Sequence, residues 1–274
     1  MSGTLYLVAT PIGNLDDMTY RGVRVLKEVD LIACEDTRHT RHLLDHFGID
    51  RPTISYHEHN EPQRSASLIV RLEAGATIAL VSDAGTPLIS DPGYRVVAAA
   101  ASAGITIVAL PGASAILPAL AASGLPTDSF YYGGFLPPKP GQRRKALTSA
   151  AGLDCTLVFY EAPHRILETL GDVAELMPRR SVVVAREMTK MHEEYLRGLA
   201  SEIAEALSMR PSIKGEMTLV IGKPAEGETD TRPARELLDQ YLSQGFSRMD
   251  AIKEIARARG APKREIYAEL EEKS

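Results

Sequence analysis

The sequence contains only two cysteines among its 274 residues, Cys34 and Cys155. They lie far apart, and each stands in an apolar run, Leu31 to Cys34 and Cys155 to Phe159. A secreted domain held by disulfides would need more cysteines at closer spacing, so the pattern excludes a disulfide framework and favours a reducing compartment. We predict that both thiols pack in the core as small apolar side chains.

The sequence also lacks a long apolar run. No stretch approaches the roughly 18 apolar residues that a membrane-spanning helix needs, and Met1 to Thr10 has no basic start of a secretory signal. We therefore predict a cytoplasmic protein with no membrane partner. The net charge of -5 argues against a generally basic surface, so a nucleic-acid site has to be a local patch.

The common nucleotide-binding signatures are missing as well. No Gly-x-Gly-x-x-Gly follows an apolar run, and the pair Gly222-Lys223 precedes Pro224 instead of the hydroxyl residue of a P-loop. A standard dinucleotide or ATP site is therefore not expected.

What the sequence does contain is a regular alternation of short apolar runs and segments with helical spacing. We interpret the runs as strands: Leu5 to Ala9, Leu31 to Cys34, Thr77 to Val81, Ile105 to Leu110, Thr156 to Tyr160, Val182 to Ala185 and Met217 to Ile221. Helices are expected between them: Tyr20 to Val29, Thr37 to Phe47, Gln63 to Glu73, Tyr94 to Ala103, Ala113 to Ala122, Arg165 to Met177 and Ala200 to Ser208. This alternation predicts an α/β protein with largely parallel sheet, covered on both faces.

Two breaks divide the chain. Glycine and proline crowd together from Ser123 to Gly141, and a polar, turn-rich segment runs from Gly222 to Asp230. We predict an N-terminal α/β domain over 1-122, a second α/β domain over 123-225, and a small helical C-terminal module over 231-274. In the module, Ser247 and Asp250 have the spacing of a capping box at a helix start, ahead of Ile252 and Ile255.

Small residues gather directly after three of the expected strands, at Thr10 to Asn14, Ser82 to Pro87 and Pro111 to Ala115. Ligands of open α/β sheets bind outside the carboxyl ends of the strands, where small residues let the backbone approach the ligand. Each loop alone is an ordinary tight turn. Together the three loops predict a cofactor cleft.

Several longer motifs identify a known family. The run Ser82 to Gly93, with Pro111 to Ala115, resembles the cofactor loops of the tetrapyrrole methylases, which bind S-adenosylmethionine between two α/β domains. Further motifs are similar to the branch of that family that methylates the 2'-hydroxyl of a cytidine in small-subunit ribosomal RNA. They are Val8 to Asp17, Cys34 to Thr40, His57 to Glu61, Phe159 to Arg165, Ala185 to Lys190 and Gly215 to Thr218.

The resemblance implies the cofactor, the partners and the cofactor site. The cofactor is S-adenosylmethionine, the partner is ribosomal RNA or the small ribosomal subunit, and the protein is a homodimer. The implied cofactor-binding residues are Pro11, Asp83, Ala84, Gly85, Thr86, Ile89, Ser90, Ser114, Ala115, Tyr160, Glu161, Arg186 and Thr218. Relatives that act on tetrapyrroles carry Gly-Asp-Pro where this chain has Gly85-Thr86-Pro87, and our hypothesis is that Asp83 replaces the missing carboxylate.

Methyl transfer from a sulfonium requires mainly that the acceptor be placed in line, but a general base can take the proton of a ribose hydroxyl. Candidates at strand ends are Glu35, Asp36, Glu161 and Glu187, with His57 and His164 behind them. We take Asp36 and Glu187 as the catalytic candidates. The alternative for each carboxylate is a loop-ordering or helix-capping role.

Basic and histidine side chains supply candidate RNA contacts. These are Arg38, Arg41, His57, His164 and Arg165, and in the C-terminal module Lys253 and Arg257. Residues 247-264 contain six basic and two acidic side chains, and the alternative is that this charge is only a solvated helix surface. His39, His42 and His46 share a helical spacing, but without a His-Glu-x-x-His motif or neighbouring cysteine we predict no metal.

Three functions are compatible with this sequence. The first is an RNA 2'-O-methyltransferase. The second is a methyltransferase for a tetrapyrrole or another small molecule, which would need an enclosed apolar cleft instead of basic surface. The third is a nonenzymatic RNA-binding protein that has kept a cofactor pocket, and transfer of label from S-adenosylmethionine separates it from the two enzymes.

Overall fold

The computed structural model describes residues 2-224, 232-259 and 261-271, and gives only the backbone of Arg257. The N-terminal part is built around a five-stranded sheet in which all strands are parallel, with the order β3-β2-β4-β1-β5. Its strands are β1 (Thr4–Leu7), β2 (Leu31–Cys34), β3 (Thr53–Ser55), β4 (Thr77–Leu80) and β5 (Thr106–Ala109). A parallel sheet was predicted here, and only the three-residue strand β3 was not expected.

Helices cover both faces of this sheet, as its apolar strands require. They are α1 (Tyr20–Glu28), α2 (Thr37–His46), α3 (Glu61–Glu73) and α4 (Tyr94–Ser102). One core lies between the sheet and α1 and α2, and a second lies between the sheet and α3 and α4. The thiol of Cys34 is buried in the first of these cores, as predicted.

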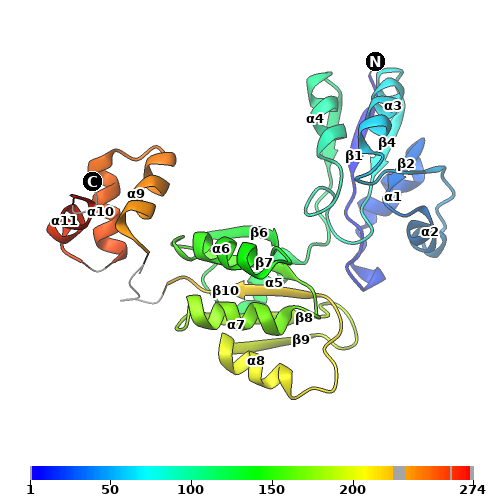
Figure 1. Cartoon of the computed structure of the whole chain (residues 1–274). Coiled ribbons are helices and arrows are strands. Elements are labelled where there is room, and N and C mark those ends of the chain that lie inside the picture. The colour runs from blue at the N-terminus through cyan, green and yellow to red at the C-terminus, as the bar shows by residue number, and fades with distance from the viewer. Residues whose placement is uncertain (1, 225–231, 260, 272–274) are drawn as a thin grey trace.

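The second sheet lies at the centre of the molecule and is mixed, with the order β6-β7-β10-β8-β9 (Figure 1). Its strands are β6 (Phe130–Phe135), β7 (Thr156–Glu161), β8 (Ser181–Arg186), β9 (Glu194–Leu199) and β10 (Met217–Ile221). Only β6 and β7 pair in parallel, while β10 is antiparallel to both β7 and β8, and β9 is antiparallel to β8. The expectation of a largely parallel sheet is therefore wrong for this half of the chain.

The connections explain the mixed sheet. Helix α7 (Ile166–Leu176) joins β7 to β8 as a crossover, so these two strands run the same way, and β10 is inserted between them. Residues 187-193 join β8 to β9, which is too short for a crossover and forces an antiparallel hairpin. The direction of a strand cannot be predicted from an apolar run, because a strand buried on both faces has the same continuous apolar pattern whichever way it runs.

The helices of this half are α5 (Ile116–Ser123), α6 (Pro140–Ala151), α7 and α8 (Ala200–Ser208). The last three pack with one face of the second sheet, around a core that includes Cys155. Helix α5 packs on the other face, where Ile116, Ala119 and Leu120 contact residues of β8 and β10. We therefore propose that the chain passes from the first domain to the second before α5, in the loop that ends at Ala115, instead of after residue 122.

The C-terminal module is a three-helix unit set apart from both sheets in Figure 1. Its helices are α9 (Ala234–Ser243), α10 (Arg248–Ala258) and α11 (Lys263–Glu271). They share a core of their own that includes Ile252 and Ile255. The expected cap at Ser247 is present, because the Asp250 backbone N–H donates to the Ser247 Oγ over 3.1 Å. Among the described residues, no helix combines the length and the apolar character needed to span a membrane.

Candidate functional site

The three small-residue loops meet at the carboxyl edge of the first sheet, as predicted. Thr10 and Gly85 exchange backbone hydrogen bonds of 2.9 and 2.8 Å, which tie the loop after β1 to the loop after β4. The Thr86 hydroxyl donates to the Ala113 carbonyl over 2.9 Å and ties in the loop after β5. These loops therefore form a single connected wall.

A cleft of about 380 Å³ lies against this wall and is closed by residues of the second sheet. Most of the implied cofactor residues line it, namely Asp83, Ala84, Gly85, Thr86, Ile89, Ser90, Ser114, Ala115, Tyr160, Glu161 and Thr218. Pro11 and Arg186 do not, and the neighbour Ile12 lines the cleft in place of Pro11. Lining residues that sequence reasoning missed are Asp91, Phe135, Ala162, Pro163, Met188, Gly215, Glu216 and Met217.

The loop after β4 holds an uncommon backbone conformation along the cleft. Leu88 and Ser90 have positive φ angles of 73° and 65°, which cost free energy in residues other than glycine and occur mostly where the surroundings impose them. Ser90 is fixed from the other domain, because its hydroxyl lies 2.6 Å from the Tyr132 Oη. The strained loop thus joins the two walls of the cleft.

Aromatic rings form the opposite wall. The Tyr160 ring lies edge-on to Tyr132 and Phe135, with centroids 5.2 and 5.4 Å away. Burial raises the pKa of the Tyr160 phenol, so this side chain stays neutral. Phe135 was missed because the Gly133-Gly134 pair hides strand β6, which contains an irregularity between Tyr132 and Phe135.

The carboxylates of Asp83 and Asp91 line the cleft, and Glu35 lies close to both. Burial, together with the nearby charges of Glu35 and Asp83, raises the pKa of Asp91 to about 6. Burial and Asp83 also raise the pKa of Glu35. The Asp83 Oδ1 accepts a 3.2 Å hydrogen bond from the Asp36 backbone N–H. This concentration of negative charge suits a ligand that carries positive charge.

Replacing Asp91 by asparagine is expected to change how stability depends on pH. The pKa of Asp91 is raised from 3.8 to about 6 in the folded chain, so the folded chain binds more protons than the unfolded chain between these values. The free energy of unfolding therefore falls as pH rises through this window. Asp91→Asn should gain about 2 kcal/mol over the wild type between about pH 4 and about pH 7.5. Urea unfolding at several pH values across this range measures the free energy of unfolding of both proteins. A difference between the two proteins that stays the same at every pH would contradict the prediction.

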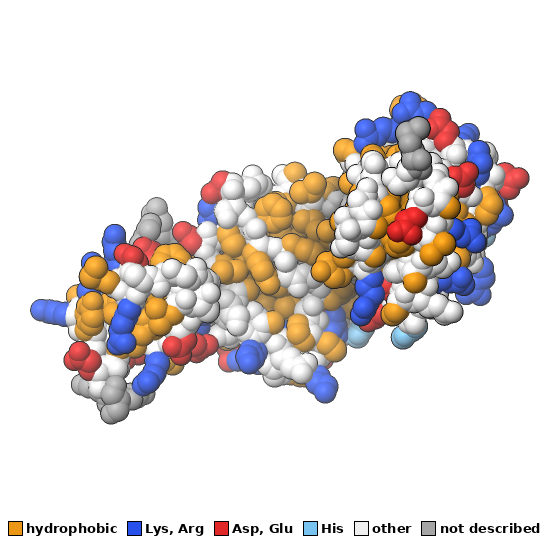
Figure 2. Space-filling view, turned by 90° about the horizontal axis from the view of Figure 1, so that it is seen from above, with side chains coloured by type: hydrophobic (Ala, Val, Ile, Leu, Met, Phe, Trp, Pro, Cys, Tyr) orange, Lys and Arg blue, Asp and Glu red, His pale blue; other side chains and the backbone are white. Residues whose placement is uncertain are grey.

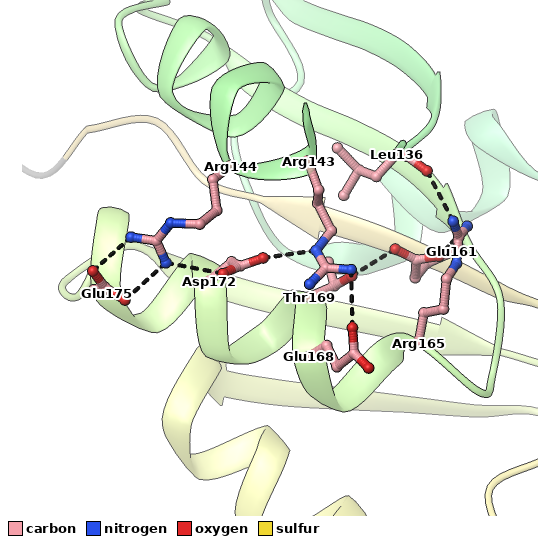
Figure 3. Close-up of polar contacts among 9 residues, drawn as sticks. All are labelled: Leu136, Arg143, Arg144, Glu161, Arg165, Glu168, Thr169, Asp172 and Glu175. Carbon is pink, nitrogen blue, oxygen red and sulfur yellow. Dashed lines mark hydrogen bonds and ion pairs between the residues drawn. The ribbon is translucent and has the colours of Figure 1, made fainter. Parts of the chain in front are cut away.

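Glu161 is the most constrained carboxylate of the cleft, and its side chain is fully buried. Its Oε1 accepts from the Ala162 N–H over 2.8 Å and lies 2.6 Å from an Arg165 guanidinium nitrogen, while its Oε2 accepts from the Thr169 hydroxyl over 2.6 Å. Arg165 also donates to the Leu136 carbonyl (Figure 3). These contacts hold Glu161 in one position, so it serves to build the wall.

The helix that carries Thr169 is itself held by ion pairs. Arg143 of α6 is buried, and its Nε donates to the Asp172 Oδ2 over 2.6 Å (Figure 3). Arg144 bridges Asp172 and Glu175 on the outer side of α7. The network fixes α7 against α6 and thereby fixes the hydroxyl that orients Glu161.

The two catalytic candidates lie outside the cleft lining. Asp36 caps helix α2, accepting from the Arg38 N–H over 2.8 Å, and its hydrogen bonds with Arg38 lower its pKa. Glu187 contacts Lys190 at 2.8 Å and accepts from the Glu216 N–H over 3.0 Å, and Lys190 lowers its pKa. These contacts match the capping and loop-ordering alternative for both residues.

The candidate RNA contacts fall into two groups. Arg38, Arg41, His164 and Lys253 are exposed side chains, Arg38 and Arg41 being paired with Asp36 and Asp45. The second group is less accessible. His57 is half-buried, and its Nε2 lies 3.0 Å from the Asn60 Nδ2, while Arg165 forms an ion pair with Glu161. The side chain of Arg257 lies outside the described residues.

Comparison with known proteins agrees with this arrangement. Residues 4–204 match the family model of the Tetrapyrrole (Corrin/Porphyrin) Methylases. The solved structure of uroporphyrin-III-C-methyltransferase from Thermus thermophilus is similar in fold, with a TM-score of 0.55 at 21% identity over 81% of this chain and 94% of that one. Diphthine synthase has a TM-score of 0.59 at 15% identity over 98% of this chain and 99% of its own. The chain therefore belongs to the tetrapyrrole methylase family.

Curated relatives narrow the assignment within that family. The chain is 49% identical to the ribosomal RNA small subunit methyltransferase I of Halalkalibacterium halodurans, over 97% of this chain and 93% of the relative. It is 48% identical to that of Synechocystis, over 97% and 96%, and 44% identical to that of Bacillus subtilis, over 97% and 93%. The chain belongs with these ribosomal RNA methyltransferases, which confirms the resemblance seen in its motifs.

Proposed function

We propose that this protein transfers the methyl group of S-adenosylmethionine to a cytidine 2'-hydroxyl in small-subunit ribosomal RNA. The observation that carries the proposal is near-full-length similarity to ribosomal RNA small subunit methyltransferase I proteins. The choice of the ribose oxygen of a cytidine rests on the motif resemblance. Both enzymes considered from the sequence use the same cofactor, and the relatives favour RNA as the acceptor.

The cleft fits S-adenosylmethionine in size and charge. Its volume of about 380 Å³ falls within the range of roughly 300 to 1,000 Å³ that is usual for small-molecule sites. When bound, the cofactor supplies an electrophilic methyl group on a positively charged sulfur. The carboxylates of Asp83 and Asp91 favour that positive charge, and Ala84 and Gly85 leave room for close approach.

The side chains of the cleft contribute mainly by placement. Orientation of two reacting groups can lower a barrier by up to about 7 to 11 kcal/mol, so holding a ribose oxygen in line with the methyl carbon can supply much of the catalysis. The rigid wall formed by Glu161, Arg165 and Thr169 serves this purpose, because it holds one side of the cleft in a fixed position. The ring of Tyr160 lines the cleft on the same side and packs edge-on against Tyr132.

The experiment that tests the function uses labelled S-adenosylmethionine and three acceptors. These are small ribosomal subunits from cells that lack this protein, naked small-subunit RNA from the same cells, and a tetrapyrrole such as uroporphyrinogen. We expect label in the RNA of the first or second acceptor and none in the tetrapyrrole. Label only in the tetrapyrrole would favour the small-molecule alternative, and no transfer at all would favour a nonenzymatic RNA-binding protein.

We further propose that the protein is a homodimer. Figure 2 shows hydrophobic side chains gathered over the central part of the molecule. The exposed large apolar residues of this half include Leu117 of α5 and Phe130, Tyr131 and Phe135 of the edge strand β6. Exposed apolar surface of this kind on an edge strand is typical of a protein interface.

The homodimer is expected to dissociate when this apolar surface is charged. Phe130→Glu/Tyr131→Glu should sediment as a monomer at micromolar concentration, where the wild type sediments as a dimer, because burying two carboxylates opposes association. Sedimentation velocity measures it, with Tyr20→Glu as control, since Tyr20 is also an exposed aromatic residue but lies on α1. A monomeric wild-type protein would contradict the proposal.

We also propose that the C-terminal module contributes RNA contacts. Arg248, Lys253, Lys263 and Arg264 are exposed, whereas Arg259 is paired with Glu269. A chain that ends at Asp230 should keep its cofactor affinity, because the module has its own core and none of its described residues lines the cleft. Its RNA affinity should fall, and the slope of log affinity against log salt should be shallower by about 0.7 to 0.9 for each phosphate that the module binds.

Lys253→Ala/Lys263→Ala is expected to lie between the full chain and the truncated chain in RNA affinity. Filter binding at several salt concentrations, with the same RNA throughout, measures all three proteins. Equal slopes for the full and truncated chains would show that the module is structural, and would leave the RNA contacts to the first domain, around Arg38 and Arg41.

A further inference from the structure

A second pocket lies beside the cleft, and it is rich in cationic side chains. Its volume is about 240 Å³, and its lining comprises Arg186, His192, Arg210, Ser212, Ile213 and Lys214. Arg186 was expected to bind the cofactor, but the structure places it here. The pocket is a different site from the cleft, because the two have no lining residue in common in the described part of the chain.

The charges in this pocket are organised by one carboxylate. Glu194 lies 2.5 Å from the Arg186 Nε and accepts a second, 3.0 Å hydrogen bond from the Arg210 Nη2. Hydrogen bonds from these two arginines lower the pKa of Glu194 to about 2, so all three groups are charged at neutral pH. Because Glu194 holds both guanidinium groups, their planes are fixed before any ligand arrives.

The pocket keeps a net positive charge after this pairing. Arg186, Arg210 and Lys214 face the single carboxylate of Glu194. The nearby carboxylates Glu187 and Glu216 are both paired with Lys190. Among the described residues Lys214 forms no ion pair, and it lines the pocket as an exposed residue, as do Ser212 and His192. Such a set of donors suits an anion with several oxygen atoms.

The backbone joins the pocket to the cleft. Met217 lines the cleft, and on the neighbouring strand β8 it is paired with Arg186, which lines the pocket. The segment Lys214 to Met217 runs from one to the other, and the Arg186 Nη1 donates to the Lys214 carbonyl over 3.0 Å. The two sites therefore lie side by side along one end of the second sheet.

We infer that this pocket binds a phosphodiester group of the RNA next to the nucleotide that enters the cleft. The inference rests on the proposed function, and it names where the RNA backbone is held. Phosphate contacts fix the register of a nucleic acid without reading its sequence, so a phosphate held here would position one ribose at the cleft. Arg186 then acts on the RNA chain and not on the cofactor.

The alternative is that Arg186, Glu194 and Arg210 only hold strand β9 on β8. Lys214 separates the two possibilities, because its side chain takes no part in that pairing. The test compares Lys214→Glu with Lys145→Glu, which changes the net charge equally at an exposed residue of α6 that lines neither pocket. Small ribosomal subunits from cells that lack this protein are the substrate.

We expect Lys214→Glu to raise the KM for subunits by about tenfold at about 0.1 M salt, and to make the salt dependence shallower by about 0.7 to 0.9. The affinity of Lys214→Glu for S-adenosylmethionine should equal that of the wild type. Lys145→Glu should match the wild type in KM, in salt dependence and in cofactor affinity. The double variant Glu194→Gln/Arg210→Gln removes one negative and one positive charge, so the net charge is unchanged, but Arg186 loses the carboxylate that holds it. It should also raise the KM for subunits and keep the cofactor affinity of the wild type.

Three results would overturn the inference in different ways. If the wild type methylates subunits and Lys214→Glu has the KM and salt dependence of Lys145→Glu, the pocket does not hold RNA phosphate. If the wild type does not methylate subunits or their RNA, the proposed function fails and the phosphate site fails with it. If Lys214→Glu binds S-adenosylmethionine more weakly than the wild type, the pocket is part of the cofactor site and not an RNA phosphate site.

Discussion

Gly85→Val is expected to reduce the affinity for S-adenosylmethionine by at least about a hundredfold, which corresponds to about 2.8 kcal/mol. Gly85 has a φ of 82°, a conformation that a β-branched residue adopts only with strain. The backbone N–H and carbonyl of Gly85 both form hydrogen bonds with the backbone of Thr10. An added Cβ would lie 3.4 Å from a side-chain carbon of Ile12, which also lines the cleft. The new side chain must therefore either move the loop or enter the cleft.

Gly48→Val is the matched control for this substitution. Gly48 has a φ of 60°, and an added Cβ would meet no atom within 4 Å. Both variants should lose stability through backbone strain, but only Gly85→Val should lose cofactor affinity. Calorimetric titration of the two folded variants decides between them. Wild-type affinity in folded Gly85→Val would remove the loop after β4 from the cofactor site.

Glu161→Ala is expected to lower the free energy of unfolding by about 3 to 5 kcal/mol, because it leaves the partly buried guanidinium of Arg165 without its carboxylate. The Ala162 N–H and the Thr169 hydroxyl lose their acceptor as well. The wall of the cleft should loosen, so cofactor affinity should fall together with stability.

Thr169→Val provides the comparison. It removes one hydrogen bond to Glu161 and leaves the ion pair, and it should cost only about 1 to 2 kcal/mol. Denaturant unfolding measures both variants. If Glu161→Ala unfolds at the wild-type midpoint, the wall is not held by this carboxylate, and the residue would have to be present for its contact with a ligand.

Much of the fold follows from the sequence because most strands are apolar and are punctuated by small residues. Strands β1, β2, β4 and β5 of the first sheet are continuous apolar runs, and a right-handed parallel arrangement is the usual outcome of alternating strands and helices. Strand β9 was missed because it is an edge strand that carries Glu194 and Arg197. The direction of β10 depends on its insertion between β7 and β8, which no local pattern contains.

The candidate site was predictable to a similar degree. The small-residue loops were found because glycine and proline mark places where backbone approaches a ligand, and these loops do line the cleft. Asp91 was missed because its raised pKa comes from burial and from the charges of Glu35 and Asp83, and only the fold shows this burial and this proximity. Arg186 was expected at the cleft, and its strand does end at the same edge as β7, but its side chain is paired with Glu194 and does not line the cleft.

The distribution of charge is consistent with two ligands of opposite sign. The carboxylates of Asp83 and Asp91 line the cleft where a cationic cofactor is proposed to bind. Cationic side chains lie next to it, in the pocket of Arg210 and Lys214, and further away on the exposed surface of the C-terminal module. A net charge of -5 is therefore compatible with RNA as substrate, because the positive charge is local.

The central claim is that this protein methylates the ribose of a cytidine in small-subunit ribosomal RNA. The most direct measurement takes small-subunit RNA from cells with and without this protein, digests it to nucleosides and to short fragments, and locates the methyl group by mass spectrometry. We expect one 2'-O-methylated cytidine that is absent without the protein and is restored by the wild type but not by Gly85→Val. Identical modification in both RNAs, or a methyl group on a base in place of a ribose, would contradict the account.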